Sequence, residues 1–516
     1  MAVPSSVCTQ SNPPLRYAIV HLTLLPSGVP VFWAQAPGPV TASLLFRVGV
    51  RDETFRNAGL THLVEHLAMG GLKRRRFEHN ASVDLTMTEF TATGTKEQVL
   101  GFVTDVCASL MALPLQRLET EVKVLEAEGG STMHPSIAEH LFHRYGLRGV
   151  GLALVSPPAL DQVEPEQVRD YAASGFTQQN CVLVLTSEPP ADFDLALPPG
   201  RLLPVPIDVP LATAPWTFES EGPEVSVSFG LVAQEPAERE AALTVLRIAL
   251  ERAEDELRHQ RGWLYDVDFQ IVGPSDDAIA CFRADPPAAH ACDVRDGLLR
   301  ILRDLADRGP TSEELAADRE AAHQHLQDPR GLSESLSECA AAHLRGRQIV
   351  DVSARLALRD ALTAEDCRSV LRRVETTLVV GMPADTELAG VVPPVRSNDS
   401  ADVVEGTSFG RSHLAGFRFG VPRGTRAIIG ERGITVTDPE GPNTVLWDDV
   451  VGLAYEQDGE SLDVLSYDGG HVPFDPVWFK DGHRAQALIE QYVPPHLRFI
   501  DRTDPSETSE AGGHPR

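Results

Sequence analysis

The chain is short of positive charge. Its 516 residues contain 45 lysines and arginines against 74 aspartates and glutamates, which gives a formal net charge of −29. An acidic surface repels phosphate backbones, so this balance argues against general nucleic-acid binding. The basic cluster at residues 73–76 is short and is expected to be a solvated loop. We expect most of the acidic charge to be solvated; any part that lines a cavity would favour basic or neutral peptides.

Long apolar runs and paired cysteines are also missing. Charges such as Arg51 and Glu53 interrupt every apolar stretch, so no membrane span is predicted. The first eight residues contain no basic segment followed by an apolar run, and we expect no secretory signal. The seven cysteines are odd in number and never spaced Cys-x-x-Cys. They favour reduced, mostly buried thiols, and together these features predict a cytoplasmic protein.

The most informative motif is His62-Leu63-Val64-Glu65-His66. Apolar residues recur with helical spacing through residues 57–70, and two glycines end the run. On a helix, His62 and His66 project from the same face one turn apart, where two neutral imidazoles can bind one Zn²⁺. Glu65 lies on the same side and can reach a water held by that metal. The alternative is two ordinary histidines on an amphipathic helix.

The order of predicted elements repeats in two halves of the chain, which is too long for one core. Each half ends with an acidic-capped helix, a short gap and an apolar strand. We interpret the halves as two copies of one α+β unit, the alternative being a coincidence of common elements. The first half has predicted strands at 17–22, 29–34, 41–50, 86–93 and 180–185 and helices at 57–70, 96–113, 114–128 and 164–171. The second has strands at 225–231, 265–271, 278–283 and 377–381 and helices at 238–259, 295–307, 312–327 and 363–371.

The pattern changes after residue 402. Residues 204–215 and 396–402 are predicted linkers, rich in proline or in polar turn residues. Short strands and one helix follow the second linker, a pattern that resembles a pleckstrin-homology-like domain. The strands are predicted at 426–430, 433–437, 444–447, 451–456, 461–466 and 470–473, and the helix at 482–492.

With the glutamates that follow the histidines, the chain resembles the M16 metallopeptidases, the family of insulinase, pitrilysin and the mitochondrial processing peptidase. In that family the two-histidine motif is followed by a helix with a glutamate seven residues before the third zinc ligand. Glu121 and Glu128 have that spacing. The resemblance implies that His62, His66 and Glu128 bind zinc, that Glu65 is the general base, and that Glu121 steadies the histidine side. It extends over residues 48–53, 59–60, 80–81 and 86–93.

Two points in this match stay open. Glu119 and Glu126 have the same spacing of seven, so a register shifted by two residues is the alternative to Glu128. The segment between Gly70 and Thr86 is shorter than is usual in the family, in place of a helix that normally flanks the site. We therefore expect the ligands to be preserved in a zinc pocket that this shortened region reshapes.

The second half contains an arginine and a tyrosine that resemble the family independently of the zinc motif. M16 enzymes use an arginine and a tyrosine seven residues apart, in the second homologous domain, to meet the scissile carbonyl and the developing oxyanion. Arg258 and Tyr265 have this spacing, and Tyr265 is the last residue of an Arg-Gly-x-x-Tyr motif that is typical of the family. The alternative is an ordinary arginine at a helix end and a tyrosine in the core.

Together these features predict an α+β protein: two M16-type domains forming a clamshell half, plus a small, mostly β, pleckstrin-homology-like domain. The resemblance implies a zinc-dependent endopeptidase of short or unfolded peptides, paired as a homodimer or with another M16 subunit. The alternative is a catalytically weak or inactive subunit that acts as a binding partner in a heterodimer. The expected domains are residues 14–203, 216–395 and 405–500, followed by a disordered tail at 501–516.

Overall fold

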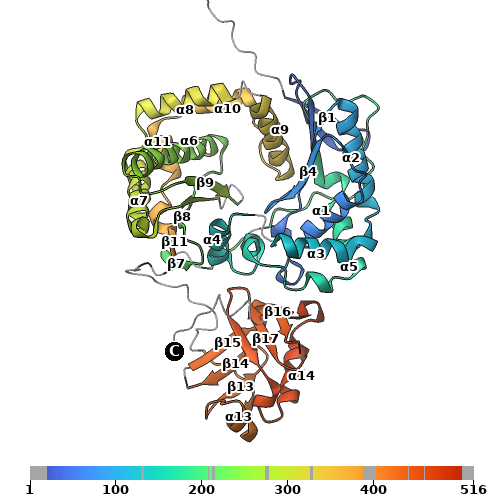
Figure 1. The fold of residues 1–516 in the computed structure, drawn as a ribbon, viewed down its shortest axis with the longest axis vertical. Helices are drawn as coiled ribbons and strands as arrows, with labels where there is room; N and C mark the ends of the chain where they lie inside the picture. The colour runs from blue at the N-terminus through green and yellow to red at the C-terminus, as the bar shows by residue number, and fades with distance from the viewer. Residues whose placement is uncertain are drawn as a thin grey trace, which may run out of the picture.

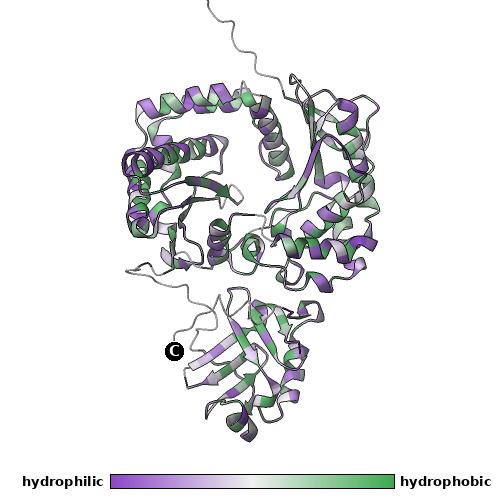
Figure 2. Cartoon of the chain, viewed as in Figure 1, coloured by the Kyte–Doolittle hydropathy of each residue, from purple (hydrophilic) through white to green (hydrophobic). Residues whose placement is uncertain are grey.

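A computed structural model describes residues 20–129, 133–206, 208–211, 215–273, 278–325, 329–384, 386, 402–439, 441–457 and 459–502. Two α+β halves stand opposite one another, and a third, β-rich unit lies beside the first half (Figure 1). Hydrophilic and hydrophobic positions alternate along the helices, as expected where only one face of each helix is buried (Figure 2). The predicted tail from residue 503 onward and the linker at 396–401 lie outside the described residues.

The first half is built on a six-stranded sheet in the order β1-β2-β6-β3-β5-β4. Strand β6 pairs parallel with β2 and antiparallel with β3, and β4 forms one edge of the sheet. The strands are β1 His21–Leu24, β2 Pro30–Trp33, β3 Val40–Phe46, β4 Glu78–Val83, β5 Thr88–Gly94 and β6 Cys181–Leu185. The helices are α1 Leu60–Gly70, α2 Lys96–Met111, α3 Leu118–Glu128, α4 Pro135–Tyr145 and α5 Pro165–Gly175.

The second half repeats this topology. Its sheet has the order β7-β11-β8-β10-β9, in which β11 pairs parallel with β7 and antiparallel with β8. The strands are β7 Trp216–Ser220, β8 Val225–Gly230, β9 Val267–Val272, β10 Ile279–Ala284 and β11 Val379–Pro383. The helices are α6 Pro236–Ala253, α7 Ala291–Arg308, α8 Ser312–His325, α9 Pro329–Leu344, α10 Val352–Ala361, α11 Ala364–Val370 and α12 Val374–Thr377. Apart from β1, the two sheets have equivalent strand orders, which confirms the α+β fold class.

Each half contributes a helix to the sheet of the other. Helix α9 of the second half packs on strands β2, β3 and β6 of the first, through Leu336 and Ala340 against Val182 and Val184. Helix α4 of the first half packs on β8, β10 and β11 of the second. Neither helix is predicted by the sequence patterns above. This exchange buries apolar surface between the halves and ties them together.

The structure also corrects several predicted boundaries. The helix predicted at 238–259 is an α-helix to Ala253 and continues as a π-helix over Glu254–Gln260. Strands β4 and β7 are not among the predicted strands. The segment between Gly70 and Thr86 contains strand β4 and no helix, consistent with its shortness.

The C-terminal unit contains two four-stranded sheets, β12-β13-β14-β15 and β18-β17-β16-β19. Helix α14 spans Gly482–Tyr492, the predicted range. Strand β12, helix α13 and strand β19 are not predicted from the sequence. The elements are β12 Thr407–Gly410, α13 His413–Arg418, β13 Arg426–Ile429, β14 Gly433–Asp438, β15 Gly441–Leu446, β16 Val450–Tyr455, β17 Leu462–Ser466, β18 His471–Phe474, α14 and β19 Arg498–Ile500.

This unit packs against the first half. The rings of Phe55 and Phe499 lie 6.0 Å apart, in a small apolar cluster shared by the two parts. The Leu147 N–H donates to the Tyr467 carbonyl at 2.5 Å. The Arg148 guanidinium lies 3.8 Å from the centre of the Tyr467 ring. The contact is therefore apolar at its centre and polar at its border.

Within the described residues, no single helix is long and apolar enough to cross a membrane. Two consecutive segments, Lys96–Met111 and Leu115–Glu128, meet the length and composition criteria only as a pair, and they are bent by 81° where they meet.

We expect Phe499→Ala to lower the free energy of unfolding by about 3 kcal/mol, because it leaves a cavity at this contact. Phe417→Ala is the matched control: Phe417 is 95% exposed, so its loss should change stability by less than about 0.5 kcal/mol. Urea unfolding of the full-length variants measures both values. Equal losses in the two variants would show that the Phe55–Phe499 contact contributes no specific stability.

Candidate metal centre

The start of helix α1 is fixed by a buried carboxylate. Glu53 accepts hydrogen bonds from the backbone N–H groups of Gly59 at 2.8 Å and Thr61 at 2.7 Å. These groups have no partner within the helix, and a carboxylate also favours the positive end of the helix dipole. Gly59 has φ +84°, and a Cβ there would lie 2.6 Å from Pro157, so a larger residue does not fit.

The apolar face of α1 determines where the histidines point. Leu63, Val64 and Leu67 are fully buried in the core of the first half. His62 and His66 lie on the other side of the helix, with side chains 21% and 16% exposed. Their rings are 4.7 Å apart, edge to face. The two imidazoles are therefore paired at the border of the core, where solvent can reach them.

Helix α3 brings a carboxylate to this pair. The Glu128 Oε2 atom lies 3.5 Å from His66 Nε2 and 4.0 Å from His62 Nε2. One ligand atom from each of His62, His66 and Glu128 falls within 4.8 Å of the others, so these three residues form the candidate metal-ligating cluster found in the described part of the chain. Glu128 is the last residue of α3, which ends at Gly129 with φ +79°.

This donor set fits zinc. Two imidazole nitrogens and one carboxylate oxygen are the ligands of catalytic zinc sites, which keep a fourth position open. At zinc bond lengths, tetrahedral ligands lie about 3.4 Å apart, so the 3.5 Å and 4.0 Å separations of Glu128 from the two histidines need only a small contraction. Burial, together with the neighbouring His66, lowers the pKa of His62 to about 4, against the opposing effect of Glu128. His62 is consequently neutral at pH 7, the form that binds a metal.

The Glu65 carboxylate faces the Nε2 atoms of the two histidines. Its Oε2 atom lies 3.7 Å from His62 Nε2 and 3.8 Å from His66 Nε2. Burial, together with the neighbouring carboxylates of Glu128 and Glu121, raises the pKa of Glu65 to about 7. The repulsion among these three carboxylates is the kind that a bound divalent cation relieves.

The Glu121 carboxylate lies beside Nδ1, the other ring nitrogen of His66. Its Oε2 atom lies 3.5 Å from His66 Nδ1, while its Oε1 atom accepts from Arg117 Nε at 2.9 Å and Arg117 Nη2 at 2.6 Å. Such a partner fixes the ring orientation and the tautomer that leaves Nε2 available. Arg117 is missing from the sequence-based site, although its position four residues before Glu121 on one helical stretch was a usable signal.

The alternative register does not reach the histidines. Glu119 pairs with Lys123 at 2.7 Å on the exposed face of α3. Glu126 is exposed, and neither glutamate belongs to the metal-ligating cluster of the described residues. The geometry therefore favours Glu121 and Glu128 over Glu119 and Glu126.

Arg258 and Tyr265 lie in the other half. Arg258 belongs to the π-helix that follows α6, and its guanidinium carbon is 5.9 Å from the centre of the Tyr265 ring. Tyr265 is 76% exposed, so it is not a core tyrosine. In the described part of the chain, neither side chain forms a hydrogen bond or an ion pair with the histidine cluster. The structure brings the pair together but does not bring it to the cluster.

Comparison with known proteins supports the fold. No protein-family model matches the chain. No curated protein matches its sequence. A protease from Helicobacter pylori matches with a TM-score of 0.60 and 14% identity, over 71% of this chain and 100% of its own. An M16-like peptidase from Alicyclobacillus acidocaldarius matches with a TM-score of 0.55 and 17% identity, over 71% of this chain and 99% of its own.

A third structural neighbour shares this fold but is an inactive peptidase domain. The inactive M16 peptidase domain from Pseudomonas fluorescens matches with a TM-score of 0.57 and 13% identity, over 72% of this chain and 100% of its own. The two halves therefore have the fold of M16-like peptidases. At this level of identity the likeness shows the fold alone, and activity has to be argued from the site.

Buried Glu53 makes the stability of this region depend on pH. Burial raises its pKa from 4.5 to about 7, against the opposing hydrogen bonds of Thr61 and Gly59. Between these two values the folded protein binds a proton that the unfolded chain has already lost, so stability falls as pH rises through this range. Glu53→Gln cannot ionise, and we expect its free energy of unfolding to fall less between about pH 5 and about pH 8. Urea unfolding across this range measures the difference; parallel curves for the two proteins would contradict the assignment.

Proposed function

We propose that the protein is a zinc-dependent endopeptidase that hydrolyses short or unfolded peptides. The observation that carries this proposal is the convergence of His62, His66 and Glu128 around Glu65. The M16-like fold of the two halves supports it. Zinc, when bound by the three ligands, supplies a Lewis acid that polarises the scissile carbonyl and acidifies water.

The protein's own groups would move the proton and position the peptide. Glu65 accepts the proton of the attacking water and passes it to the leaving amine. The open edge of β4, next to α1, can bind an extended peptide through backbone hydrogen bonds. Binding through the main chain selects extended or unfolded peptides rather than folded proteins.

Arg258 and Tyr265 are assigned to stabilisation of the developing oxyanion. Because this pair does not contact the histidine cluster within the chain, it would act after closure of the two halves or across a dimer. The dimer partner would be a second copy or another M16-type subunit. The C-terminal unit, which we regard as pleckstrin-homology-like, lies on the first half through the Phe55–Phe499 contact and supplies no side chain to the cluster.

Zinc content tests the ligand set. Glu128→Gln is expected to lower zinc affinity by at least about tenfold, because it removes a charged ligand. Glu126→Gln, on the same helix and exposed, is the control and should retain the wild-type zinc content. Atomic absorption after dialysis against a dilute chelator measures both. Retention of zinc by the Glu128 variant together with loss from the Glu126 variant would favour the alternative register.

Cleavage of an unstructured peptide tests the reaction. Glu65→Gln should keep zinc but lower kcat by about a thousandfold, because the general base is lost. Glu119→Gln, on the exposed face of α3, should leave both unchanged. Full activity in the Glu65 variant would refute the mechanism. Bound zinc with no cleavage by the wild-type protein would instead support the inactive binding subunit.

A further inference from the structure

A pocket between the two halves is lined by arginines. It has a volume of about 390 Å³ and is bordered by residues 84–86 of the first half, by the end of β9, and by α6 and α9 of the second half. Arg239, Arg345 and Arg347 line it, and also line a smaller adjoining pocket between α6, α9 and α10. We call the larger cavity the arginine pocket. Its cations are unexpected in a chain whose net charge is −29.

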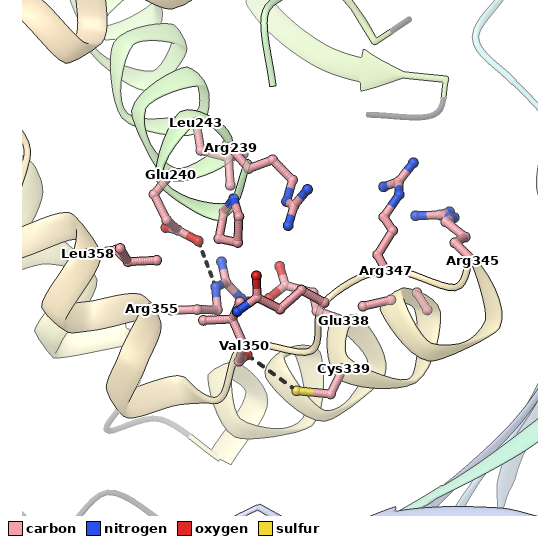
Figure 3. A pocket seen from close by; sticks show the side chains of 14 residues that line it. Arg239, Glu240, Leu243, Glu338, Cys339, Arg345, Arg347, Val350, Arg355 and Leu358 are labelled. Carbon is pink, nitrogen blue, oxygen red and sulfur yellow. Dashed lines mark hydrogen bonds and ion pairs between the residues drawn. The ribbon is translucent and has the colours of Figure 1, made fainter. Parts of the chain in front are cut away.

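Nearby carboxylates are engaged with other groups. Glu240 pairs with Arg355 at 2.7 Å and with Arg359 at 3.2 Å. Glu338 also pairs with Arg355. In Figure 3, Arg355 and Glu240 face one another, whereas Arg345 and Arg347 lie on the other side of the pocket, with Arg239 between. The charges of these two glutamates are thus largely compensated by Arg355 and Arg359 rather than by Arg239 or Arg345.

Asp84, the remaining acidic residue that lines the pocket, accepts hydrogen bonds from the turn that follows it. Its Oδ1 atom accepts from the backbone N–H of Thr86 at 2.5 Å and of Met87 at 2.6 Å. It forms no ion pair of 4.0 Å or less with an arginine among the described residues. The Asp84 carboxylate therefore shapes this wall of the pocket, and its charge acts on Arg345 without a direct ion pair.

Arg239 and Arg345 donate only to neutral oxygens within the described chain. The Arg239 Nη1 atom donates to the Gln234 carbonyl at 2.5 Å, and the Arg345 Nη2 atom donates to Thr86 Oγ1 at 2.9 Å. Burial lowers the pKa of Arg345; Asp84 opposes this, and the neighbouring Arg51 and Arg47 add to it. A largely buried guanidinium with neutral partners retains donors that suit a carboxylate.

The pocket lies where a bound peptide would continue. Strand β4 packs beside helix α1, which carries His62 and His66, and its free edge is the proposed peptide-binding edge. Residues 84–86, which follow β4 directly, form part of the pocket wall. A peptide paired along the free edge of β4 would therefore run toward the pocket at the Val83 end of the strand.

We propose that the arginine pocket is a specificity subsite that binds a carboxylate of the peptide substrate, either an Asp or Glu side chain or the C-terminal carboxylate. This inference rests on the proposed peptidase function and names its substrate class: peptides with an acidic group near the cleaved bond. It differs from what acidic charge lining a cavity would favour, which is basic or neutral peptides.

Peptide binding to the Glu65→Gln protein tests the subsite separately from catalysis. The probes are short, fluorescently labelled, unstructured peptides that carry one Glu at varied positions, and the same peptides with Gln. We expect the best Glu peptide to bind about tenfold more tightly than its Gln counterpart, as one charge-assisted contact would give. Free-acid and amidated C-termini distinguish a terminal carboxylate from a side chain, and either source supports the subsite.

Substitutions of the pocket arginines test which residues cause the preference for Glu peptides over Gln peptides. Arg345→Gln and Arg239→Gln should each remove most of the difference between the Glu and Gln peptides while leaving the Gln peptide's affinity unchanged. Arg239→Glu should reverse the preference toward a Lys peptide, a gain that misfolding cannot produce. Arg372→Gln is the control: Arg372 is exposed, donates to the neutral Ser369 carbonyl at 3.3 Å and lies outside the pocket.

The outcomes separate the two proposals. Binding and cleavage of peptides without any preference for a carboxylate would overturn the subsite alone. A preference that persists in both the Arg239 and Arg345 variants, or a loss of affinity shared equally by Glu and Gln peptides, would do the same. If no peptide of any charge is bound or cleaved, the peptidase proposal itself fails, and the substrate class with it.

Discussion

The buried face of helix α1 is the constraint on which the site depends. Leu63, Val64 and Leu67 are fully enclosed in the first core, and each contributes about 2 kcal/mol by leaving water. Turning the helix to move His62 and His66 away from α3 would expose this apolar surface. The metal-ligating geometry is therefore a consequence of hydrophobic packing, with the Glu53 carboxylate fixing where the helix begins.

The exchange of α4 and α9 extends this constraint to both α+β halves. Each helix belongs by sequence to one half and packs on the sheet of the other. Their burial links the position of α1 to that of the second half. Arg345, directly after α9, reaches Thr86 beside the first sheet. The arginine pocket exists because this exchange places cations from the second half against a turn of the first.

Helices with a regular apolar period were predictable, whereas a helix whose apolar face is interrupted by several charged residues was not. The apolar spacing predicts α1, α2 and α14 with nearly correct boundaries. Helix α4 escapes prediction because Glu139, His140 and Arg144 interrupt its apolar face although all three are buried. Their partners lie on second-half strands: Glu139 accepts from Ser220, and Arg144 donates to the Ser228 carbonyl. A residue pattern does not show a partner that is distant in sequence.

The sequence by itself determined the positions within single helices: two histidines one turn apart and two glutamates two turns apart. Helix geometry alone fixes such spacings. Only the tertiary structure decided which glutamates meet the histidines, that Arg117 orients Glu121, and that Arg258 and Tyr265 lie apart from the cluster in one chain. These are contacts between elements, and the packing of the cores sets them. The same packing makes the cavity between the halves locally cationic in an acidic protein, because charge in a pocket depends on which side chains converge there.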